Sequence, residues 1–375
     1  MNYTIGIDTR MLHKTGIGTY LKGLLRGFSR TTPEPRHSLC AFGQKLAPEH
    51  PNARLHTRPF YASIYSIGEQ IEYPFRLKNC RIWHAPHYNV PLATGRTRLV
   101  VTIHDIIHWI FRKDFFSPLQ AFYAGRMLKA AVRKADRIIA VSNKTRDDLL
   151  EHFDADPEKV RVIYEGVSEE FHELAPEAPI ISSVRKKYGI PGPFFLYVGM
   201  IKPHKNVLGL LRMFRKLKNE CKIQSTLVLV GRKDARYPKD FQELAGLQSG
   251  RDVIHLPFVE KGELVALYNA ALALVHPSLY EGFGLTLLEA MACAAPVLAC
   301  RAASIPEIAG EAACLVDPCA EREMMDALVR LEKAPGLREE YRRKGRQQAA
   351  RFRWEDTARK TAEVYEEVLA LGPSA

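Results

Sequence analysis

Short apolar runs alternate with amphipathic stretches of helical period along the whole chain. The apolar runs have the length of buried strands, and the stretches between them are suited to helices that cover a sheet. This alternation is typical of parallel sheets with helices on their faces. We therefore predict an α/β protein with two doubly wound, Rossmann-like domains.

The predicted strands form two sets, one in each half of the chain. They lie at residues 3–8, 38–42, 81–84, 98–104, 137–141 and 160–163, and at 194–199, 225–231, 253–256, 273–276, 296–299 and 314–316. A Pro-rich stretch at 174–181 separates the sets, and a charged amphipathic helix follows Trp354. We place the first domain at 1–177, the second at 178–353 and the last helix at 354–375. Ligands of doubly wound sheets bind beyond the carboxyl ends of the strands, so we expect the domains to face a binding cleft.

The segment 280–299, YEGFGLTLLEAMACAAPVLA, predicts an anion site. A glycine-rich turn runs directly into a helix, whose first N–H groups and positive dipole end favour phosphate, while glycines allow a ligand to approach the backbone. The candidate binding residues are Glu281, Gly282, Phe283, Gly284, Leu285, Thr286 and Glu289. An ordinary buried helix preceded by a loop glutamate would give the same pattern.

The spacing of the two glutamates narrows the kind of ligand. Eight helical residues rise about 12 Å, whereas the paired acids of glycoside hydrolases lie about 5 to 9.5 Å apart. Glu281 and Glu289 are therefore too far apart to act on one bond, but they can hold opposite ends of a long ligand. A nucleoside diphosphate sugar has this form, with Glu281 facing the sugar, the helix N-terminus the diphosphate and Glu289 the ribose.

A glycine loop after the first strand is a second candidate element. Gly16 and Gly18 fit a poor dinucleotide fingerprint, because Leu21 stands where a third glycine is required and no acidic residue is well placed further on. A hydride-transfer enzyme is therefore disfavoured. The loop could reach toward a diphosphate, or it could be a plain turn between strand and helix.

Two further elements end predicted strands. His104 and Asp105 lie at the end of one strand of the first domain, so His104 is a candidate to contact a reacting sugar, with Asp105 orienting His104 or balancing its charge. In the second domain, Met200 and Lys205 follow the strand at 194–199. A lysine here would neutralise charge on a departing diphosphate, although exposed loop lysines are common.

The histidines and cysteines do not indicate a metal site. His84, His87 and His108 lie near one another in sequence, but their spacing matches no compact ligand set. Seven scattered cysteines without a C-x-x-C pair fit reduced thiols. We expect no metal and no cofactor other than the sugar nucleotide as co-substrate.

Composition and charge bear on location and partners. A chain of 375 residues with 46% apolar content supports two domains, and it has no apolar run long enough to cross a bilayer and no secretory h-region. We expect a cytoplasmic protein. The net charge of +12 includes a stripe of Arg126, Lys129, Arg133 and Arg137, opposite an apolar face that includes Phe122. The stripe could contact anionic lipid or simply be a solvated helix face; no nucleic-acid-binding motif is present.

Taken together, these segments resemble the retaining glycosyltransferases of family 4, which have the two-domain GT-B fold. The matching segments are GIGTY at 16–20, VVTIHDIIH at 100–108, AVSN at 140–143, YVGMIKPHKN at 197–206, LVLVG at 227–231, EGFGLTLLEAMA at 281–292 and SIPEIAGEAACLVDP at 304–318. The Glu-x7-Glu segment followed by a PV turn is the most specific of them. HAPHYNVP at 84–91 is similar to mannosyl and rhamnosyl transferases of surface polysaccharide assembly.

The resemblance implies roles for individual residues. Glu281 and the backbone of 282–286 would hold donor sugar and phosphates, Glu289 the ribose, Lys205 the diphosphate and His104 the transferred sugar. Phe258 and Val259 would lie near the nucleobase. The last helix would cross back onto the first domain, and activity would be independent of metal.

The chain also departs from the pattern. Many relatives have Arg at the position of Met200, Pro at that of Thr286 and Asn at that of Glu165, which we expect to be structural only. The expected reaction is retaining transfer of a hexose, with mannose from GDP-mannose the first choice, to a glycan or lipid-diphosphate-linked acceptor. UDP sugars or dTDP-rhamnose as donors remain open, as do a sugar-nucleotide epimerase, a phosphorylase and a nonenzymatic sugar-nucleotide binding protein.

Overall fold

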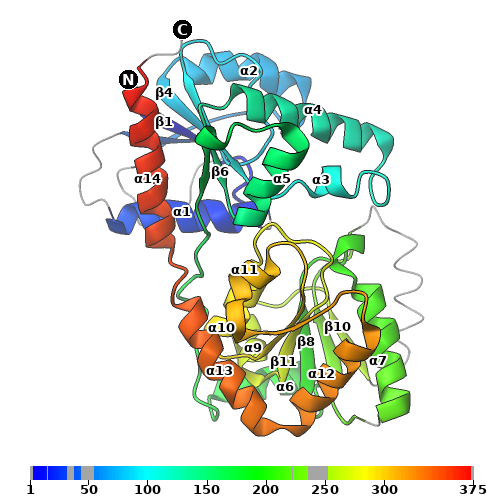
Figure 1. Cartoon of the computed structure of the whole chain (residues 1–375). Coiled ribbons are helices and arrows are strands. Elements are labelled where there is room, and N and C mark those ends of the chain that lie inside the picture. Colours follow the sequence, from blue (N-terminus) through cyan, green and yellow to red (C-terminus); the bar gives the residue numbers. More distant parts are fainter. Residues whose placement is uncertain are drawn as a thin grey trace. The chain divides into compact units, whose positions relative to one another are not determined.

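The computed structural model describes residues 3–14, 16–31, 38–43, 55–221, 223–234 and 252–372. The chain divides into two compact units. The first comprises Met1–Gly166 together with Arg353–Ala375, and the second Val167–Phe352. Each unit contains one parallel sheet with helices packed against it (Figure 1).

The sheet of the first unit has the strand order β3-β2-β1-β4-β5-β6-β7. Its strands are β1 (Tyr3–Asp8), β2 (Leu39–Phe42), β3 (His56–Arg58), β4 (Cys80–Ala85), β5 (Arg98–Ile103), β6 (Arg137–Ala140) and β7 (Val160–Val162). Its helices are α1 (Ile17–Thr31), α2 (Ile67–Leu77), α3 (Ile107–Ile110), α4 (Pro118–Lys134), α5 (Asn143–Phe153) and α14 (Trp354–Ala370), with a 3₁₀ turn η1 (Pro157–Lys159). The order reverses direction beside β1, as in doubly wound sheets.

One face of this sheet is covered by α2, α4 and α5. Side chains such as Tyr73, Leu128 and Leu149 share one apolar core with Trp83 and Val101 of the strands. The helix α4 begins at a capping box, in which Ser117 accepts from the backbone N–H of Gln120 and the Gln120 side chain accepts from that of Ser117.

The other face holds α1 and the last helix, α14, which crosses α1 (Figure 1). Two glycines of α1 permit this close crossing, because a Cβ on Gly23 would lie 2.1 Å from the Trp354 ring and one on Gly27 would lie 2.3 Å from the Trp354 carbonyl oxygen. A buried polar chain adds to the contact. His84 binds the Tyr365 hydroxyl with Nδ1 (2.6 Å) and the Thr102 hydroxyl with Nε2 (2.8 Å). Burial lowers the pKa of His84 to about 3, so this histidine is neutral.

The sheet of the second unit has the order β10-β9-β8-β11-β12-β13. Its strands are β8 (Phe194–Val198), β9 (Thr226–Val230), β10 (Val253–Leu256), β11 (Ala273–His276), β12 (Val297–Cys300) and β13 (Cys314–Val316). Its helices include α6 (Pro179–Lys187), α7 (Val207–Cys221), α9 (Lys261–Ala270), α10 (Leu285–Ala292), α11 (Ile305–Ala309), α12 (Glu321–Lys333) and α13 (Pro335–Ala349), with 3₁₀ turns η2 (Pro203–Lys205) and η3 (Gly310–Ala312). The segments that follow β8 and β11 carry most of the candidate donor residues.

The boundary between the units lies at Gly166 rather than at residue 177 as predicted. Residues after Gly166 contact the second unit: the Phe171 ring meets the Tyr268 ring at 6.1 Å, and the backbone N–H of Leu174 donates to Asn269 Oδ1 at 2.8 Å. The Pro-rich stretch thus lies on the second unit rather than forming the linker.

The predicted basic stripe is shorter than expected. Arg137 lies in β6 rather than on the helix, and its guanidinium donates to Glu367 at 2.9 Å. Phe122, placed on the buried face in the prediction, is 65% exposed with the Arg126 guanidinium 5.8 Å from its ring centre. Phe122 precedes Arg126 by four residues and so shares the basic side of α4, whereas the buried residues Ala124, Leu128 and Ala131 lie on another side of the helix.

Candidate donor-binding site

The Glu281 carboxylate receives two donors on a single oxygen. Lys205 Nζ lies 2.5 Å and His276 Nε2 2.9 Å from Glu281 Oε1. Burial opposes ionisation of this carboxylate, but Lys205 and His276 outweigh burial and hold the pKa of Glu281 well below its ordinary value. Lys205 ends η2 after β8, His276 ends β11, and Glu281 lies in the loop that follows β11. Three elements at the carboxyl edge of the sheet therefore converge on one charge cluster.

His276 is oriented from its other side as well. Its side chain is 3% exposed, and Thr286 Oγ1, in the first turn of α10, lies 3.5 Å from Nδ1. Since Nε2 donates to an ionised carboxylate, Nδ1 is the nitrogen that can accept from the Thr286 hydroxyl in the neutral imidazole. The helix N-terminus and the carboxylate are thus joined through one imidazole ring.

The glycine-rich turn is fixed by Ser304. Its hydroxyl donates to the backbone carbonyls of Glu281 (2.9 Å) and Phe283 (3.0 Å). Gly284 precedes α10 with a φ of 114°, a conformation that strains other residues. Gly282, Phe283 and Gly284 are buried, and Leu285 and Thr286 are half-buried. The turn is therefore a rigid approach to the helix N-terminus, which is the geometry required for binding an anion through backbone N–H groups.

Glu289 lies one turn after Leu285, the first residue of α10. The Tyr268 hydroxyl donates to Glu289 Oε2 at 3.1 Å. Burial raises the pKa of Glu289 to about 7, although the Tyr268 hydrogen bond and Lys261 act in the opposite direction. Unlike Glu281, this carboxyl changes its charge close to neutral pH.

The ends of β8 and β9 approach each other closely. A Cβ on Gly231 would lie 1.8 Å from the Gly199 carbonyl oxygen, so this crossing requires glycine. Met200 follows directly, and its carbonyl accepts from the Tyr197 hydroxyl at 3.3 Å. Val259 is buried, whereas Phe258 is 58% exposed with the Arg232 guanidinium 5.5 Å from its ring centre. An exposed ring beside a cation is suited to stacking on a nucleobase.

In the first unit, His104 is oriented by Glu165 and not by Asp105, so that part of the prediction is wrong. His104 Nδ1 lies 2.8 Å from Glu165 Oε1, and Nε2 donates to the Pro86 carbonyl at 3.1 Å. Asp105 instead accepts from the backbone N–H of Ile107, the first residue of α3, at 3.0 Å. Glu165, which we expected to be structural only, is the buried acid beside the candidate histidine.

The glycine loop after β1 has a packing explanation. A Cβ on Gly18 would lie 2.5 Å from the Leu12 carbonyl oxygen, and Gly16 has a φ of 39° just before α1. Both glycines are needed for this turn, and their contact with a donor stays a prediction.

The three clustered histidines do not converge on a common point. His84 binds Tyr365 and Thr102, His87 Nδ1 accepts from the Asn89 backbone, and His108 Nδ1 lies 3.3 Å from the Tyr88 hydroxyl. Among the described residues, Asp148, Glu151 and His152 on α5 are close enough to share an ion, but Lys144 Nζ already lies 2.5 Å from Asp148.

Sequence reasoning missed His276, Glu165 and Tyr268. His276 could have been found, because it ends a predicted strand at the carboxyl edge of the sheet, just as His104 does. Glu165 and Tyr268 carry no such signal, since each meets its partner only through the tertiary fold: Glu165 and His104 are 61 residues apart, and Tyr268 and Glu289 are 21 apart.

Comparison with solved structures defines the class of fold. The chain is similar to Anabaena Alr3699/HepE, solved in complex with UDP and glucose, with a TM-score of 0.78, 19% identity and coverage of 98% of this chain and 100% of that one. Two parallel-sheet, Rossmann-like units of this kind are the GT-B fold, as predicted.

Sequence comparison then gives the family. Residues 15–171 match the profile described as Glycosyltransferase Family 4, and residues 181–348 match that of Glycosyl transferases group 1. The chain belongs to glycosyltransferase family 4.

Two curated relatives come from Escherichia coli. The O-antigen chain mannosyltransferase B is 28% identical over 84% of this chain and 82% of its own length. The serotype-specific mannosyltransferase WbdA is 29% identical over 76% of this chain, and the match spans only 36% of WbdA.

Proposed function

We propose that this protein is a retaining mannosyltransferase, which transfers mannose from GDP-mannose to a hydroxyl of a glycan or lipid-diphosphate-linked acceptor in surface polysaccharide assembly. The observation that carries the proposal is the cluster of Lys205, His276 and Glu281 at the N-terminus of α10, with Glu289 about one turn into the helix. This arrangement offers a cation and backbone N–H groups to a diphosphate, and carboxylates to hydroxyl groups at either end. Mannose is favoured because both relatives described above are mannosyltransferases by name.

The proposed chemistry is mainly electrostatic. As the glycosidic bond of the donor breaks, negative charge grows on the leaving diphosphate, and Lys205 with the α10 N-terminus would stabilise it. No residue of the cluster is placed as an obvious nucleophile for a sugar held by Glu281. We therefore propose front-face attack by the acceptor hydroxyl, assisted by the departing phosphate and without a metal ion.

His104 would contact the transferred sugar from the first unit. Both of its ring nitrogens are bound in the ligand-free protein, to Glu165 and to Pro86. A hydrogen bond from His104 Nε2 to a sugar hydroxyl would therefore replace the bond to the Pro86 carbonyl, while Glu165 keeps the ring oriented.

The proposed acceptor also suggests where the protein works. No helix among the described residues is long and apolar enough to cross a membrane. An acceptor on a lipid diphosphate would bring a protein of net charge +12 to the anionic cytoplasmic face of the membrane. We propose a cytoplasmic enzyme in peripheral contact with that surface.

The first test is a thermal-shift panel of nucleoside diphosphates and their sugars. Selective stabilisation by GDP and GDP-mannose would support the donor assignment, whereas stabilisation by a uridine or thymidine compound would replace it. Proton NMR would then monitor mannose transfer to an acceptor and report the anomeric configuration of the product. Conversion of GDP-mannose without acceptor would identify an epimerase, and binding without release of GDP would identify a nonenzymatic binding protein.

A further inference from the structure

The helix α2 carries a second row of apolar side chains, directed outward, in addition to the buried Tyr73 and Leu77. Ile67, Ile71 and Phe75 follow one another at intervals of four residues and are 84%, 65% and 61% exposed, whereas Glu69 is fully buried on the opposite side. In a helix that only covers a sheet, the apolar residues lie inward and the charged ones outward. Three large apolar side chains in one exposed row require a separate explanation.

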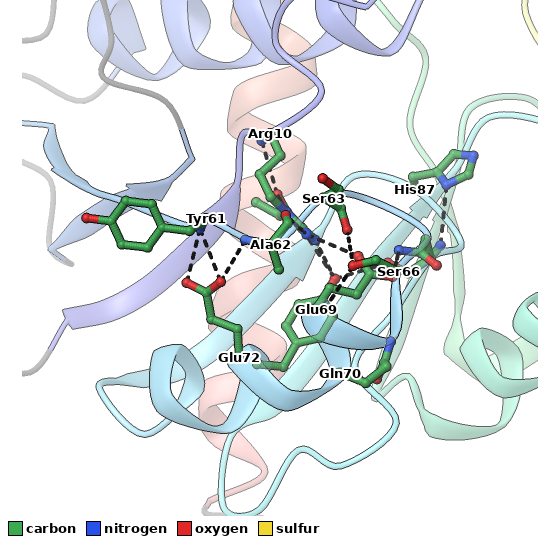
Figure 2. Close-up of polar contacts among 12 residues, drawn as sticks. Arg10, Tyr61, Ala62, Ser63, Ser66, Glu69, Gln70, Glu72 and His87 are labelled. Atoms are coloured by element: carbon green, nitrogen blue, oxygen red, sulfur yellow. Dashed lines mark hydrogen bonds and ion pairs between the residues drawn. The ribbon is translucent and has the colours of Figure 1, made fainter.

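Polar contacts of Glu69 and Glu72, together with the packing of Tyr73 and Leu77 in the core, fix the outward direction of the exposed row. The Glu72 carboxylate accepts from the backbone N–H of Tyr61 (3.1 Å) and Ala62 (2.8 Å), as Figure 2 shows. Glu69 accepts from Arg10 Nη1 at 3.0 Å and from Asn89 Nδ2 at 2.7 Å. Rotating the helix to bury the row would break these bonds and expose a buried ion pair, so the arrangement is stable as it stands.

The exposed apolar surface continues onto neighbouring segments of the first unit. Of the eleven large hydrophobic side chains exposed among the described residues, eight lie here: Tyr61, Tyr65, Ile67, Ile71, Phe75, Leu92, Leu119 and Phe122. The Tyr65 and Tyr123 rings meet edge to face at 6.0 Å and join the start of α2 to α4. The Gln70 side chain accepts from the backbone N–H of Leu92 at 2.9 Å and joins α2 to that loop.

Cations border these apolar side chains. The Lys78 ammonium lies 5.9 Å from the Phe75 ring centre, the Arg76 guanidinium 5.7 Å from that of Tyr61, and the Arg126 guanidinium 5.8 Å from that of Phe122. Between residues 60 and 134, Asp114 is the single exposed acidic residue, and every other exposed charged side chain is a lysine or an arginine. An apolar face bordered by cations is complementary to a surface with anionic groups above an apolar layer.

We propose that the face formed by α2, the segment before it and the first turns of α4 is a docking surface for an anionic lipid bilayer. The helix α2 lies along the membrane plane and inserts Ile67, Ile71 and Phe75 among the lipid chains, while the bordering cations bind the headgroups. The purpose of this docking surface, which is to bring the enzyme to a lipid-linked acceptor, rests on the proposed function. The membrane contact itself does not depend on that function. It differs from the basic-stripe prediction in that apolar side chains of α2, and not the charges of α4 alone, make the contact.

The test is flotation of the full-length protein with lipid vesicles. Vesicles of phosphatidylcholine with phosphatidylglycerol are compared with pure phosphatidylcholine, at about 0.1 M and about 0.5 M salt. We expect binding to the anionic vesicles that weakens with salt. The triple variant Ile67→Ser, Ile71→Ser, Phe75→Ser should bind at least about tenfold more weakly, and Ile180→Ser, an exposed position in the second unit, should bind like the unaltered protein.

A variant with two reversed charges tests whether the face binds anionic lipid rather than another protein. Lys78→Glu with Arg126→Glu should lose most of the binding to anionic vesicles and its dependence on salt, with an unchanged unfolding temperature. Binding that is unchanged in both variants would overturn the proposal. So would an absence of vesicle binding combined with a dimer that the triple serine variant converts to a monomer, because the face would then bind a second copy.

Transfer to a short-chain, water-soluble acceptor distinguishes this proposal from the proposed function. The triple serine variant should retain this transfer and lose transfer to acceptor embedded in vesicles. If the unaltered protein transfers no sugar but still binds anionic vesicles through α2, the proposed function fails and the docking surface stands.

Discussion

The ion pair between Lys205 and Glu281 leads to an unusual prediction: removing an acid of the donor site should tighten nucleotide binding. Lys205 Nζ lies 2.5 Å from Glu281 Oε1, and the two side chains are 22% and 13% exposed. A diphosphate that recruits Lys205 has to break this pair first. The variant Glu281→Gln keeps the shape of the side chain and removes its charge.

The expected gain follows from the difference between two hydrogen bonds. A bond to a charged group contributes about 1.5 to 3 kcal/mol and one between neutral groups about 0.5 to 1.5 kcal/mol. Freeing Lys205 from an amide should therefore cost roughly 1 to 1.5 kcal/mol less than freeing it from the carboxylate. This difference corresponds to about five- to twelvefold tighter binding of GDP. Sugar transfer should nevertheless fall by about a hundredfold or more, because Glu281 is proposed to hold the sugar.

Isothermal titration calorimetry with GDP at fixed salt measures the affinity. The matched control is Glu263→Gln, which neutralises the acid of a lysine–glutamate pair elsewhere in the second unit and should leave GDP affinity unchanged. Adding Lys205→Met to Glu281→Gln should abolish the gain. If Glu281→Gln binds GDP no better than the unaltered protein, Lys205 is not held back by Glu281 and the reasoning is refuted.

Three further predictions concern the same site. Lys205→Ala should lower the rate of transfer by about a hundredfold or more, whereas Lys187→Ala should not; a near-normal rate would remove this lysine from the mechanism. His276→Gln retains a hydrogen-bond donor near the Nε2 position, whereas His276→Asn does not. The Asn variant alone should therefore have a lower kcat, with unchanged affinity for GDP. Equal kcat values for the two variants would contradict a role for His276 in positioning Glu281. Glu289→Gln should stabilise the ligand-free protein at pH 8 by on the order of 2 kcal/mol, and this gain should disappear as the pH falls from about 7 to below 4.5, measured by thermal unfolding. Because burial raises the pKa of Glu289, the folded protein binds a proton at this carboxyl between about pH 7 and pH 4.5 that the unfolded chain does not bind, so the destabilising charge is lost as the pH falls. A gain in stability that persisted at low pH would contradict burial of the charge as its cause.

The pattern of apolar runs predicted the strands of both sheets closely, with one exception. β3 (His56–Arg58) was missed because it is short, lies at the edge of its sheet and has all three side chains exposed. A strand of this kind has no apolar period to detect. The turn before α10 was visible in the sequence because Glu281 and Gly284 belong to one local segment that runs into the helix.

The orientation of the site residues could not be predicted in the same way. Asp105 follows His104 directly in sequence, yet the strand's end directs Asp105 to the backbone of α3 and leaves His104 to Glu165. Which acid reaches a histidine is decided by the packing of separate loops, and sequence proximity is a poor guide to it. The outward face of α2 was equally hidden, because the inward role of Glu69 depends on Arg10 and Asn89 from other loops.

The crossing of α14 over α1 has a consequence for biosynthesis. The first unit needs Trp354 and the rest of α14 to cover α1, but the ribosome makes this helix only after the whole second unit. During translation, the groove around Gly23 and Gly27 therefore remains uncovered, as do the Tyr20 and Phe28 rings that pack on Trp354 and Tyr365. The second unit can fold first, and the first unit closes only when the last helix leaves the ribosome. A chain stopped at Phe352 would contain the second unit with its proposed donor residues and still expose this groove, so we expect it to bind chaperones.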